Sequence, residues 1–264
     1  MWPYPKIVAH RGGGTLAPEN TVAGLRAGLA YGFHAVEFDV MLSRDGIGMV
    51  MHDPDFGRTV AGQGSVAHTD AAALAAMDAG QWFGDAFRGE PVPFFTQFID
   101  YCKEHRIWMN VEIKPAPGHD AATGRWVAQA TRTAFADELR AGDTARVPLL
   151  SSFSMEALAA ARDAAPEVPR GCLFDQLPHN WAEVARELDA VAIHTNHKHL
   201  SAAQTAAIKA AGFGLFCYTV NTPERANEIL AWGVDGFCTD RIDLIGPGFG
   251  QDGETSGAVP LAVR

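Results

Sequence analysis

Apolar and polar residues alternate along the chain in blocks that predict a repeating order of strands and helices. Short apolar runs bounded by turn residues are typical of strands, and helical stretches with recognisable ends separate most of them. The predicted strands are 6–10, 35–40, 47–52, 107–113, 147–152, 170–174, 190–195, 213–220 and 235–239.

Two of the intervening helices have clear boundary signals. Ser201 with Gln204 forms a predicted capping box at the start of one helix. Another helix has Thr222 as its cap and Pro223 at its first position, and Gly233 ends it. Repeated strand–helix units of this kind indicate a mainly parallel sheet with crossover helices.

At this length the pattern fits either a closed eight-stranded barrel or an open, doubly wound sheet. No GxGxxG or GxxxxGK[ST] motif follows a strand, which disfavours a nucleotide-binding open sheet without excluding it. Nine strands are one too many for a barrel, but Asp45-Gly46 is a two-residue hairpin signal before the run 47–52. We therefore predict an α/β fold, a (β/α)8 TIM barrel in which 47–52 is a hairpin partner of the second barrel strand.

The domain prediction is a single barrel over residues 1–245 with one insertion at about 54–106, directly after the hairpin. The inserted segment holds a short Ala-rich helix near 69–79 and breaks the regular strand–helix order. Barrel enzymes carry specificity on such excursions at the C-terminal ends of their strands. The Gly-rich, aperiodic residues 246–264 are predicted to be a flexible tail.

Composition is that of a globular protein, with 47% hydrophobic and 20% charged residues in 264. A net charge of -10 makes nucleic acid and anionic membrane surfaces unfavourable partners. We expect a cytoplasmic location and no stable membrane insertion, because no secretory pattern or long apolar run is present. The four cysteines are isolated and predicted to be buried free thiols; nothing signals an oligomeric state.

The first candidate functional site consists of carboxylates on two predicted strands. Glu37 and Asp39 alternate with apolar residues, so both point to one face, and Glu112 repeats this pattern on strand 107–113. Like charges inside a parallel barrel are costly unless a cation neutralises them or they lie in a wet cleft. Three carboxylates suit Mg²⁺, Ca²⁺ or Mn²⁺. The alternatives are a solvated sheet face and an internal pair between Glu112 and Lys114.

Two histidines at predicted strand ends add acid/base groups. His10-Arg11 and His52 follow the first and third strands, at the end where barrel active sites lie. The guanidinium of Arg11 suits a phosphate, and a histidine can take or give a proton near neutral pH. Together with a metal and Lys114, these groups suit phosphoester cleavage, although surface loops would also explain His10 and His52 taken singly.

The motifs AHRGGGTLAPENT, VEFDVMLSRDG, VMHDP and NVEIKP, in this order, resemble the glycerophosphodiester phosphodiesterases of the cytoplasmic bacterial type. The resemblance continues through LLSSF, Tyr218-Thr219-Val220-Asn221 and DGFCTD and covers residues 6–245. It implies a (β/α)8 barrel with a small insertion after the HD motif. The implied activity is hydrolysis of glycerophosphocholine or glycerophosphoethanolamine type diesters to sn-glycerol 3-phosphate and an alcohol.

The resemblance also implies roles for individual residues. A divalent cation, Mg²⁺ or Ca²⁺, would be bound by Glu37, Asp39 and Glu112, and Arg11 and Lys114 would hold the phosphate. His10 and His52 would be the acid/base pair, and we favour His10 as the base and His52 as the acid. In such enzymes a glycerol hydroxyl of the substrate attacks phosphorus, and water then opens a cyclic glycerol phosphate.

Aromatic residues are weaker candidates for holding the alcohol group. Tyr218 occupies a position where the family commonly has Trp, and Phe153 ends LLSSF at a strand end; both are predicted to contact substrate, with core packing as the alternative for Phe153. The segment Pro93-Phe94-Phe95-Thr96 also departs from the family's Pro-Thr-Leu run. A choline-binding aromatic wall, or packing within the insertion, would explain Trp82, Phe83, Phe94 and Phe95.

Two other functions are compatible with the same fold. A metal-dependent aldolase or isomerase would use the carboxylates and Lys114 without needing both histidines. A non-catalytic binding protein would keep the scaffold, but such a chain is expected to have lost at least one catalytic residue type, and none is lost here.

Overall fold

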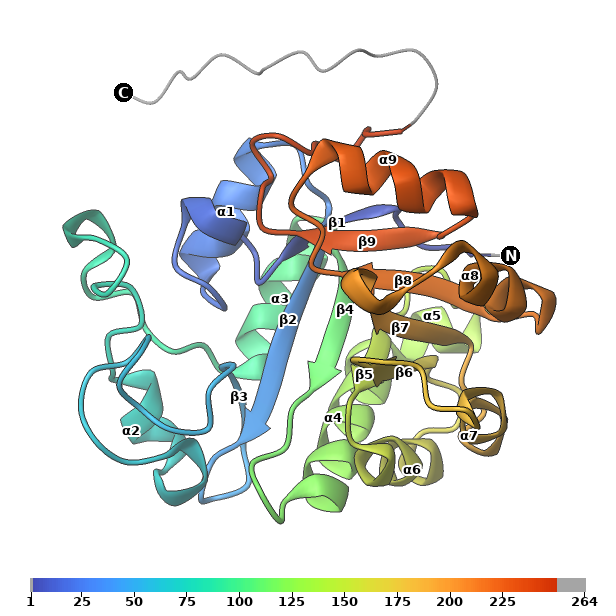
Figure 1. Cartoon of the computed structure of the whole chain (residues 1–264). Helices are drawn as coiled ribbons and strands as arrows, with labels where there is room; N and C mark the ends of the chain where they lie inside the picture. Colours follow the sequence, from blue (N-terminus) through green and yellow to red (C-terminus); the bar gives the residue numbers. More distant parts are fainter. Residues whose placement is uncertain (1, 251–264) are drawn as a thin grey trace.

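The computed structural model describes residues 2–250 and contains a sheet that closes into a barrel (Figure 1). Its eight parallel strands are joined edge to edge, because β1 pairs with both β2 and β9. The predicted (β/α)8 barrel is confirmed, and the open sheet is wrong. The strands are β1 (Ile7–His10), β2 (Ala35–Leu42), β3 (Gly48–Val50), β4 (Trp108–Ile113), β5 (Leu149–Ser152), β6 (Arg170–Phe174), β7 (Ala192–Asn196), β8 (Gly214–Tyr218) and β9 (Gly236–Thr239).

Helices connect successive barrel strands and cover the outside of the barrel (Figure 1). Their buried faces and the outward residues of the strands form two large apolar clusters. Through residue 250 no helix follows β9; turn residues such as Ile242 and Ile245 cover that side. The α-helices are α1 (Val22–Ala30), α2 (Ala71–Ala75), α3 (Phe95–Glu104), α4 (Asp120–Ala134), α5 (Ala136–Arg140), α6 (Met155–Ala164), α7 (Trp181–Glu187), α8 (Ala202–Ala210) and α9 (Pro223–Trp232). Short 3-10 helices are Gly14–Leu16, Val66–His68, Asp85–Phe87 and His197–His199.

The hairpin expected at Asp45-Gly46 is present. β3 runs antiparallel to β2, and Gly46 takes a φ of 77°, which a side chain would disfavour. Met41 and Met49 on this hairpin pack against the segment that follows it, in a separate apolar cluster that includes Val60 and Leu74. The hairpin therefore fixes the added segment to the barrel beside the end of β2 (Figure 1).

The added segment is shorter than the predicted insertion at 54–106. Its last part is α3, a regular crossover helix whose apolar residues Phe95, Phe98 and Ile99 pack in the barrel–helix core. Their helical spacing gives α3 one apolar face, so it behaves as a barrel helix and not as part of the excursion. Phe95 is fully buried in that core and Phe94 packs against the insertion cluster, which corresponds to the packing alternative for these two aromatics.

Aromatic rings close the end of the barrel opposite to the strand C-termini. Trp2 stacks on Phe216 with centroids 5.9 Å apart, and Tyr4 stacks on Trp108 at 4.8 Å. These rings belong to a cluster that also holds inward residues from other strands. Because this end of the barrel interior is apolar, the polar side chains that point inward lie nearer to the C-terminal ends of the strands.

Several smaller expectations concern the rest of the chain. All four cysteines are buried and free, as predicted. Among residues 2–250 no helix has the length and apolarity needed to cross a membrane, and a cytoplasmic location stays a prediction. The predicted flexible tail, 246–264, lies outside the described residues from 251 onward.

Candidate active site

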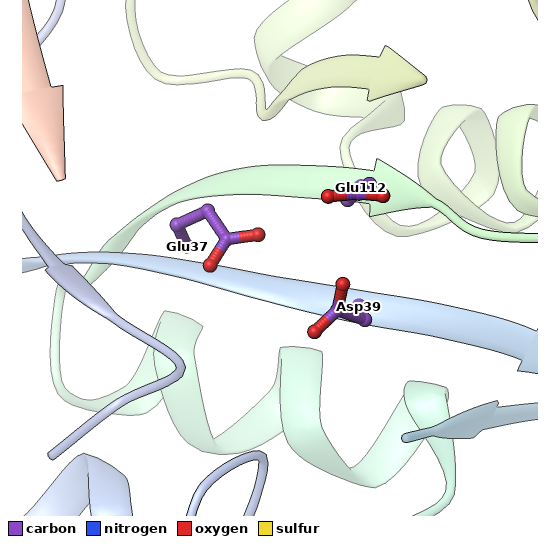
Figure 2. Close-up of side chains that lie close together, drawn as sticks. All are labelled: Glu37, Asp39 and Glu112. Atoms are coloured by element: carbon purple, nitrogen blue, oxygen red, sulfur yellow. The ribbon is translucent and has the colours of Figure 1, made fainter. Parts of the chain in front are cut away.

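Glu37, Asp39 and Glu112 point toward one another from the adjacent strands β2 and β4 (Figure 2). One carboxylate oxygen of each lies within 4.8 Å of the others, and all three residues are buried. The register places Asp39 directly beside Glu112 across the two parallel strands. The three carboxylates, which alternate with apolar residues in the sequence, therefore form one cluster inside the barrel.

The cluster is electrostatically strained when it holds only these side chains. Burial, together with the charges of Asp39 and Glu112, raises the pKa of Glu37 well above its usual range. Burial and the Asp39 charge also raise the pKa of Glu112 to about 7. Asp39 Oδ1 is buried and has no hydrogen-bond partner. An oxygen without a donor, among three converging carboxylates, fits a hard divalent cation such as Mg²⁺ or Ca²⁺.

Two cationic side chains lie against the cluster. Lys114 Nζ is 3.2 Å from Glu112 Oε1 and 3.6 Å from Asp39 Oδ1, and Arg11 Nε is 3.3 Å from Asp39 Oδ2. Burial by itself would raise the pKa of Asp39, but Arg11 and Lys114 outweigh it and hold that pKa far below the usual range. Lys114 and Arg11 approach the cluster from the strand ends, where they can also meet an anionic ligand.

His10 is oriented by the other end of the chain. Its Nδ1 lies 2.5 Å from Asp240 Oδ1, and its Nε2 lies 3.6 Å from Glu37 Oε2. Because a carboxylate only accepts hydrogen bonds, the ring carries its hydrogen on Nδ1 and turns Nε2 toward the cluster. Asn221 Nδ2 donates to Asp240 Oδ2 at 2.8 Å, which fixes the carboxylate in turn.

His52 is anchored by a carboxylate in the same way, and it also contacts Lys114. Its Nδ1 lies 2.6 Å from Asp53 Oδ1, and Lys114 Nζ donates to its Nε2 at 2.7 Å. The pKa of His52 is lowered, first by burial and then by the positive charges of Arg11 and Lys114. In this arrangement Nε2 of His52 faces Lys114 and the site.

The first site loop has an unusual backbone. Arg11 and Asn20 have φ values of 51° and 58°, the left-handed region that costs most side chains energy. Asn20 N–H donates to the Arg11 carbonyl at 2.9 Å, and Asn20 Nδ2 donates to Asp39 Oδ2 at 2.9 Å. This strained loop is thus held by its contacts with the carboxylate cluster, and it places Arg11 over the cluster.

Phe153, directly after β5, and Tyr218, at the end of β8, lie against each other at the C-terminal ends of the strands. Their rings meet edge to face with centroids 5.8 Å apart, and Phe153 is 45% exposed. Tyr218 Oη donates to the Phe174 carbonyl at 3.0 Å, which holds the ring at the end of β8. The two predicted substrate contacts thus form one aromatic pair at the strand ends, and their role stays a prediction.

Comparison with known proteins identifies the family. The glycerophosphoryl diester phosphodiesterase family model matches residues 10–244. The chain belongs to this family. A solved phosphodiesterase from Oleispira antarctica, in complex with the product sn-glycerol-3-phosphate, is 32% identical with a TM-score of 0.80, covering 89% of this chain and 93% of that one.

Other family members agree with this assignment. The solved glycerophosphodiester phosphodiesterase of Agrobacterium tumefaciens is 29% identical with a TM-score of 0.74, covering 90% of this chain and 97% of that one. A glycerophosphodiester phosphodiesterase of Caldanaerobacter subterraneus is 28% identical over 89% of this chain and 93% of its own length. The resemblance read from the motifs is therefore confirmed, and this family member is a phosphodiesterase on a TIM barrel.

Several residues of the site were not singled out by the sequence analysis. Asp240 and Asn221 lie in the recognised motifs DGFCTD and Tyr218–Asn221, but only the structure shows that they orient His10. Asp53, Glu19 and Arg58 form a second charged group around His52 and Arg11. These residues lie on loops, where no alternation of apolar and polar positions indicates which way a side chain points.

Proposed function

We propose that this protein hydrolyses glycerophosphodiesters, of the glycerophosphocholine and glycerophosphoethanolamine type, to sn-glycerol 3-phosphate and an alcohol. The observation that carries the proposal is the pair of imidazoles, each anchored through Nδ1 by a carboxylate, beside a cluster of three converging carboxylates. Membership of the phosphodiesterase family and the product seen in the Oleispira relative support the same reaction.

The phosphate group would lie between the cations at the mouth. Arg11 and Lys114 neutralise its oxygens, since both are held protonated by the carboxylates beside them. Burial would lower the pKa of Lys114, but Asp39 and Glu112 outweigh it and raise that pKa. A divalent ion held by Glu37, Asp39 and Glu112 would polarise the phosphoryl oxygens as a Lewis acid.

The partners of the two anchoring carboxylates distinguish the histidines. The free oxygen of Asp240 accepts from the neutral amide of Asn221, whereas the second oxygen of Asp53 accepts from the guanidinium of Arg58. Asp53 therefore stabilises a protonated imidazole less, and the lowered pKa of His52 makes its proton easier to release. This difference supports His10 as the base and His52 as the acid of the first step.

The reaction then follows two steps. His10 Nε2 takes the proton of a glycerol hydroxyl as its oxygen attacks phosphorus, and the bond from phosphorus to the alcohol oxygen breaks. His52 enters this step as the imidazolium, with Lys114 turned from its Nε2 to the phosphate. It gives the Nε2 proton to the leaving oxygen, and the products are a cyclic glycerol phosphate and a free alcohol. In the second step water attacks phosphorus with the roles reversed, so that sn-glycerol 3-phosphate forms and both histidines return to their first states.

The aromatic pair is the proposed contact for the alcohol. Phe153 and Tyr218 present ring faces and edges at the strand ends, and a ring face attracts the cationic group of choline or ethanolamine. Their substitution by Leu is expected to affect KM more than kcat, since neither ring bonds to a group in the proton transfers.

The experiment that tests the proposal is release of glycerol 3-phosphate from glycerophosphocholine by purified protein. It is run with EDTA, with Mg²⁺ or Ca²⁺ restored, and with Glu37→Ala and His52→Ala. Metal-dependent release that both substitutions abolish supports the whole assignment. Absence of release from any glycerophosphodiester with either ion overturns it, and intact diester turnover in His52→Ala would instead favour chemistry that needs only the carboxylates and Lys114.

A further inference from the structure

Arg58, on the inserted segment, makes three charged hydrogen bonds to two carboxylates. Its Nε donates to Asp53 Oδ2 at 2.6 Å, and its Nη1 and Nη2 donate to the two oxygens of Glu19 at 2.7 Å each. The pairing with Glu19 is bidentate, a geometry that fixes direction as well as distance. Arg58 therefore ties Asp53 and Glu19 into one rigid group.

Both of these carboxylates also hold a residue of the proposed machinery. Asp53 Oδ1 accepts from His52 Nδ1 at 2.6 Å, and Glu19 Oε1 accepts from Arg11 Nη1 at 2.9 Å. A continuous chain of hydrogen bonds thus runs from His52 through Arg58 to Arg11. It connects His52, the proposed acid/base residue after β3, to Arg11, the proposed phosphate-binding residue after β1.

The backbone of Arg58 is fixed by the insertion core. The neighbouring residues Thr59 and Val60 are buried, and Val60 packs in the apolar cluster formed with the β2–β3 hairpin. Gly57 N–H donates to the Val60 carbonyl, and Asp55 and Ser65 form an isolated bridge that closes the loop. The Arg58 side chain is 46% exposed, so this loop presents it from the solvent side.

We propose that Arg58 is a positioning residue, which sets the orientations of His52 and Arg11 together by holding Asp53 and Glu19. The inference rests on the proposed phosphodiester reaction. It also assigns a catalytic purpose to the inserted segment, namely to supply in one side chain the link between the acid/base group and the phosphate-binding group.

Loss of Arg58 should lower the turnover rate without preventing the protein from folding. Arg58 is itself half-exposed, and without it Glu19 keeps its pair with Arg11 and Asp53 keeps its bond to His52, so loss of Arg58 leaves neither carboxylate without a partner. A misplacement of about 1 Å at a catalytic group can lower the rate on the order of 10²-fold. Removal of Arg58 therefore lowers kcat while the protein stays folded, because Asp53 and Glu19 lose the contact that fixes their orientation.

The test uses Arg58→Gln and Arg58→Lys with Arg44→Gln as the matched control. Arg44 makes a bidentate pair with Asp70 near the same hairpin, and its partner contacts no proposed site residue. We expect kcat for glycerophosphocholine to fall about 10- to 100-fold in Arg58→Gln, less in Arg58→Lys, and not in Arg44→Gln. KM should change less than kcat, since Lys114 is held by Glu112 independently of Arg58 and still binds the phosphate.

Comparison of a triple variant with its double-variant background separates positioning from general loss of structure. If Arg58 acts through Asp53 and Glu19, adding Arg58→Gln to the Asp53→Asn, Glu19→Gln background should cost no further activity. Additive losses, or turnover of Arg58→Gln within about two-fold of the wild type, would overturn the inference.

A readout without turnover keeps this inference distinct from the proposed function. The nitrogen NMR signals of the His52 ring report the hydrogen on Nδ1, and Arg58→Gln should alter them while Arg44→Gln should not. A wild-type chain that cleaves no glycerophosphodiester would overturn the proposed function alone. An unchanged His52 signal in both Arg58 variants would overturn the role of Arg58 alone.

Discussion

His10 and His52 each have a carboxylate on Nδ1, so the orientation of both rings depends on Asp240 and Asp53. The alternating pattern of β2 and β4 was enough to predict that Glu37, Asp39 and Glu112 face one another. Loop residues such as Asp240 could not be assigned a partner from the sequence, because their bonds join segments that meet only when the barrel closes.

Asp240→Asn should reduce activity with little change in substrate binding. The amide removes the anionic partner of His10 Nδ1, so the imidazole loses the contact that points its Nε2 at the site. We expect kcat for glycerophosphocholine to fall about 10²- to 10⁴-fold, the usual contribution of one proton transfer. Asp243→Asn is the control, because Asp243 pairs with Arg241 in the following turn. Equal kcat values in the two variants would contradict the role of Asp240.

His194 should make the protein less stable in mild acid. Burial lowers the pKa of this ring to about 3, and its Nε2 has no hydrogen-bond partner. The unfolded chain binds a proton here below about pH 6.5, while the folded protein does not. The free energy of unfolding therefore falls as pH decreases from about 6.5 toward 3, by about 1.4 kcal/mol per pH unit from this residue.

The measurement is urea unfolding at two pH values, about 7.5 and 5.5. His194→Gln should show a smaller loss of unfolding free energy between them than the wild type, whatever its absolute stability. The exposed His179 supplies the control, and His179→Gln should keep the wild-type loss. An identical loss in all three proteins would show that His194 does not titrate in this way.

At the scale of elements, the strands could be predicted from apolar alternation, whereas the limits of the insertion could not. Helix α3 begins at Phe95, directly after the aromatic loop. The apolar residues of the helix could therefore not be told apart from those of the loop in the sequence. The positions of the crossover helices also depend on contacts between helices that are far apart in the sequence. Gly124 on α4 shows this, since a Cβ there would lie 2.0 Å from the Ala157 carbonyl oxygen of α6.

Gly124→Ala should therefore destabilise the protein, although alanine favours a helix. The added methyl group forces α4 and α6 apart, and overpacking of this kind typically costs about 1–3 kcal/mol. Thermal or urea unfolding measures the change. At Gly246 a Cβ meets nothing within 4 Å, so Gly246→Ala should be close to neutral. A Gly124→Ala protein as stable as the wild type would mean that the two helices can separate freely.

At the scale of the whole molecule, the carboxylate cluster links ion binding to stability. Three buried acids on β2 and β4 repel one another, and this repulsion raises the pKa values of Glu37 and Glu112. A ligand that binds only the folded protein stabilises it by mass action. Binding of the cation should therefore raise the unfolding temperature of the protein, whether or not substrate is present.

Addition of Mg²⁺ or Ca²⁺ to EDTA-treated protein should raise Tm. At about 100 times the dissociation constant the gain in unfolding free energy is about 2.7 kcal/mol. The shift should be lost in Glu37→Gln and kept in Asp85→Asn, which changes an exposed acid paired with Arg88. A Tm that neither ion raises would contradict the metal site.

The closure of the barrel has a consequence for how the protein is made. His10 and Asp240 are separated by 230 positions, and they come together only when β1 pairs with β9. Contacts of such long sequence separation form slowly, and during synthesis the first strand must wait for the last. All three residues of the carboxylate cluster are synthesised before Asp240, so we expect hydrolytic competence to begin only after the final barrel strand is released.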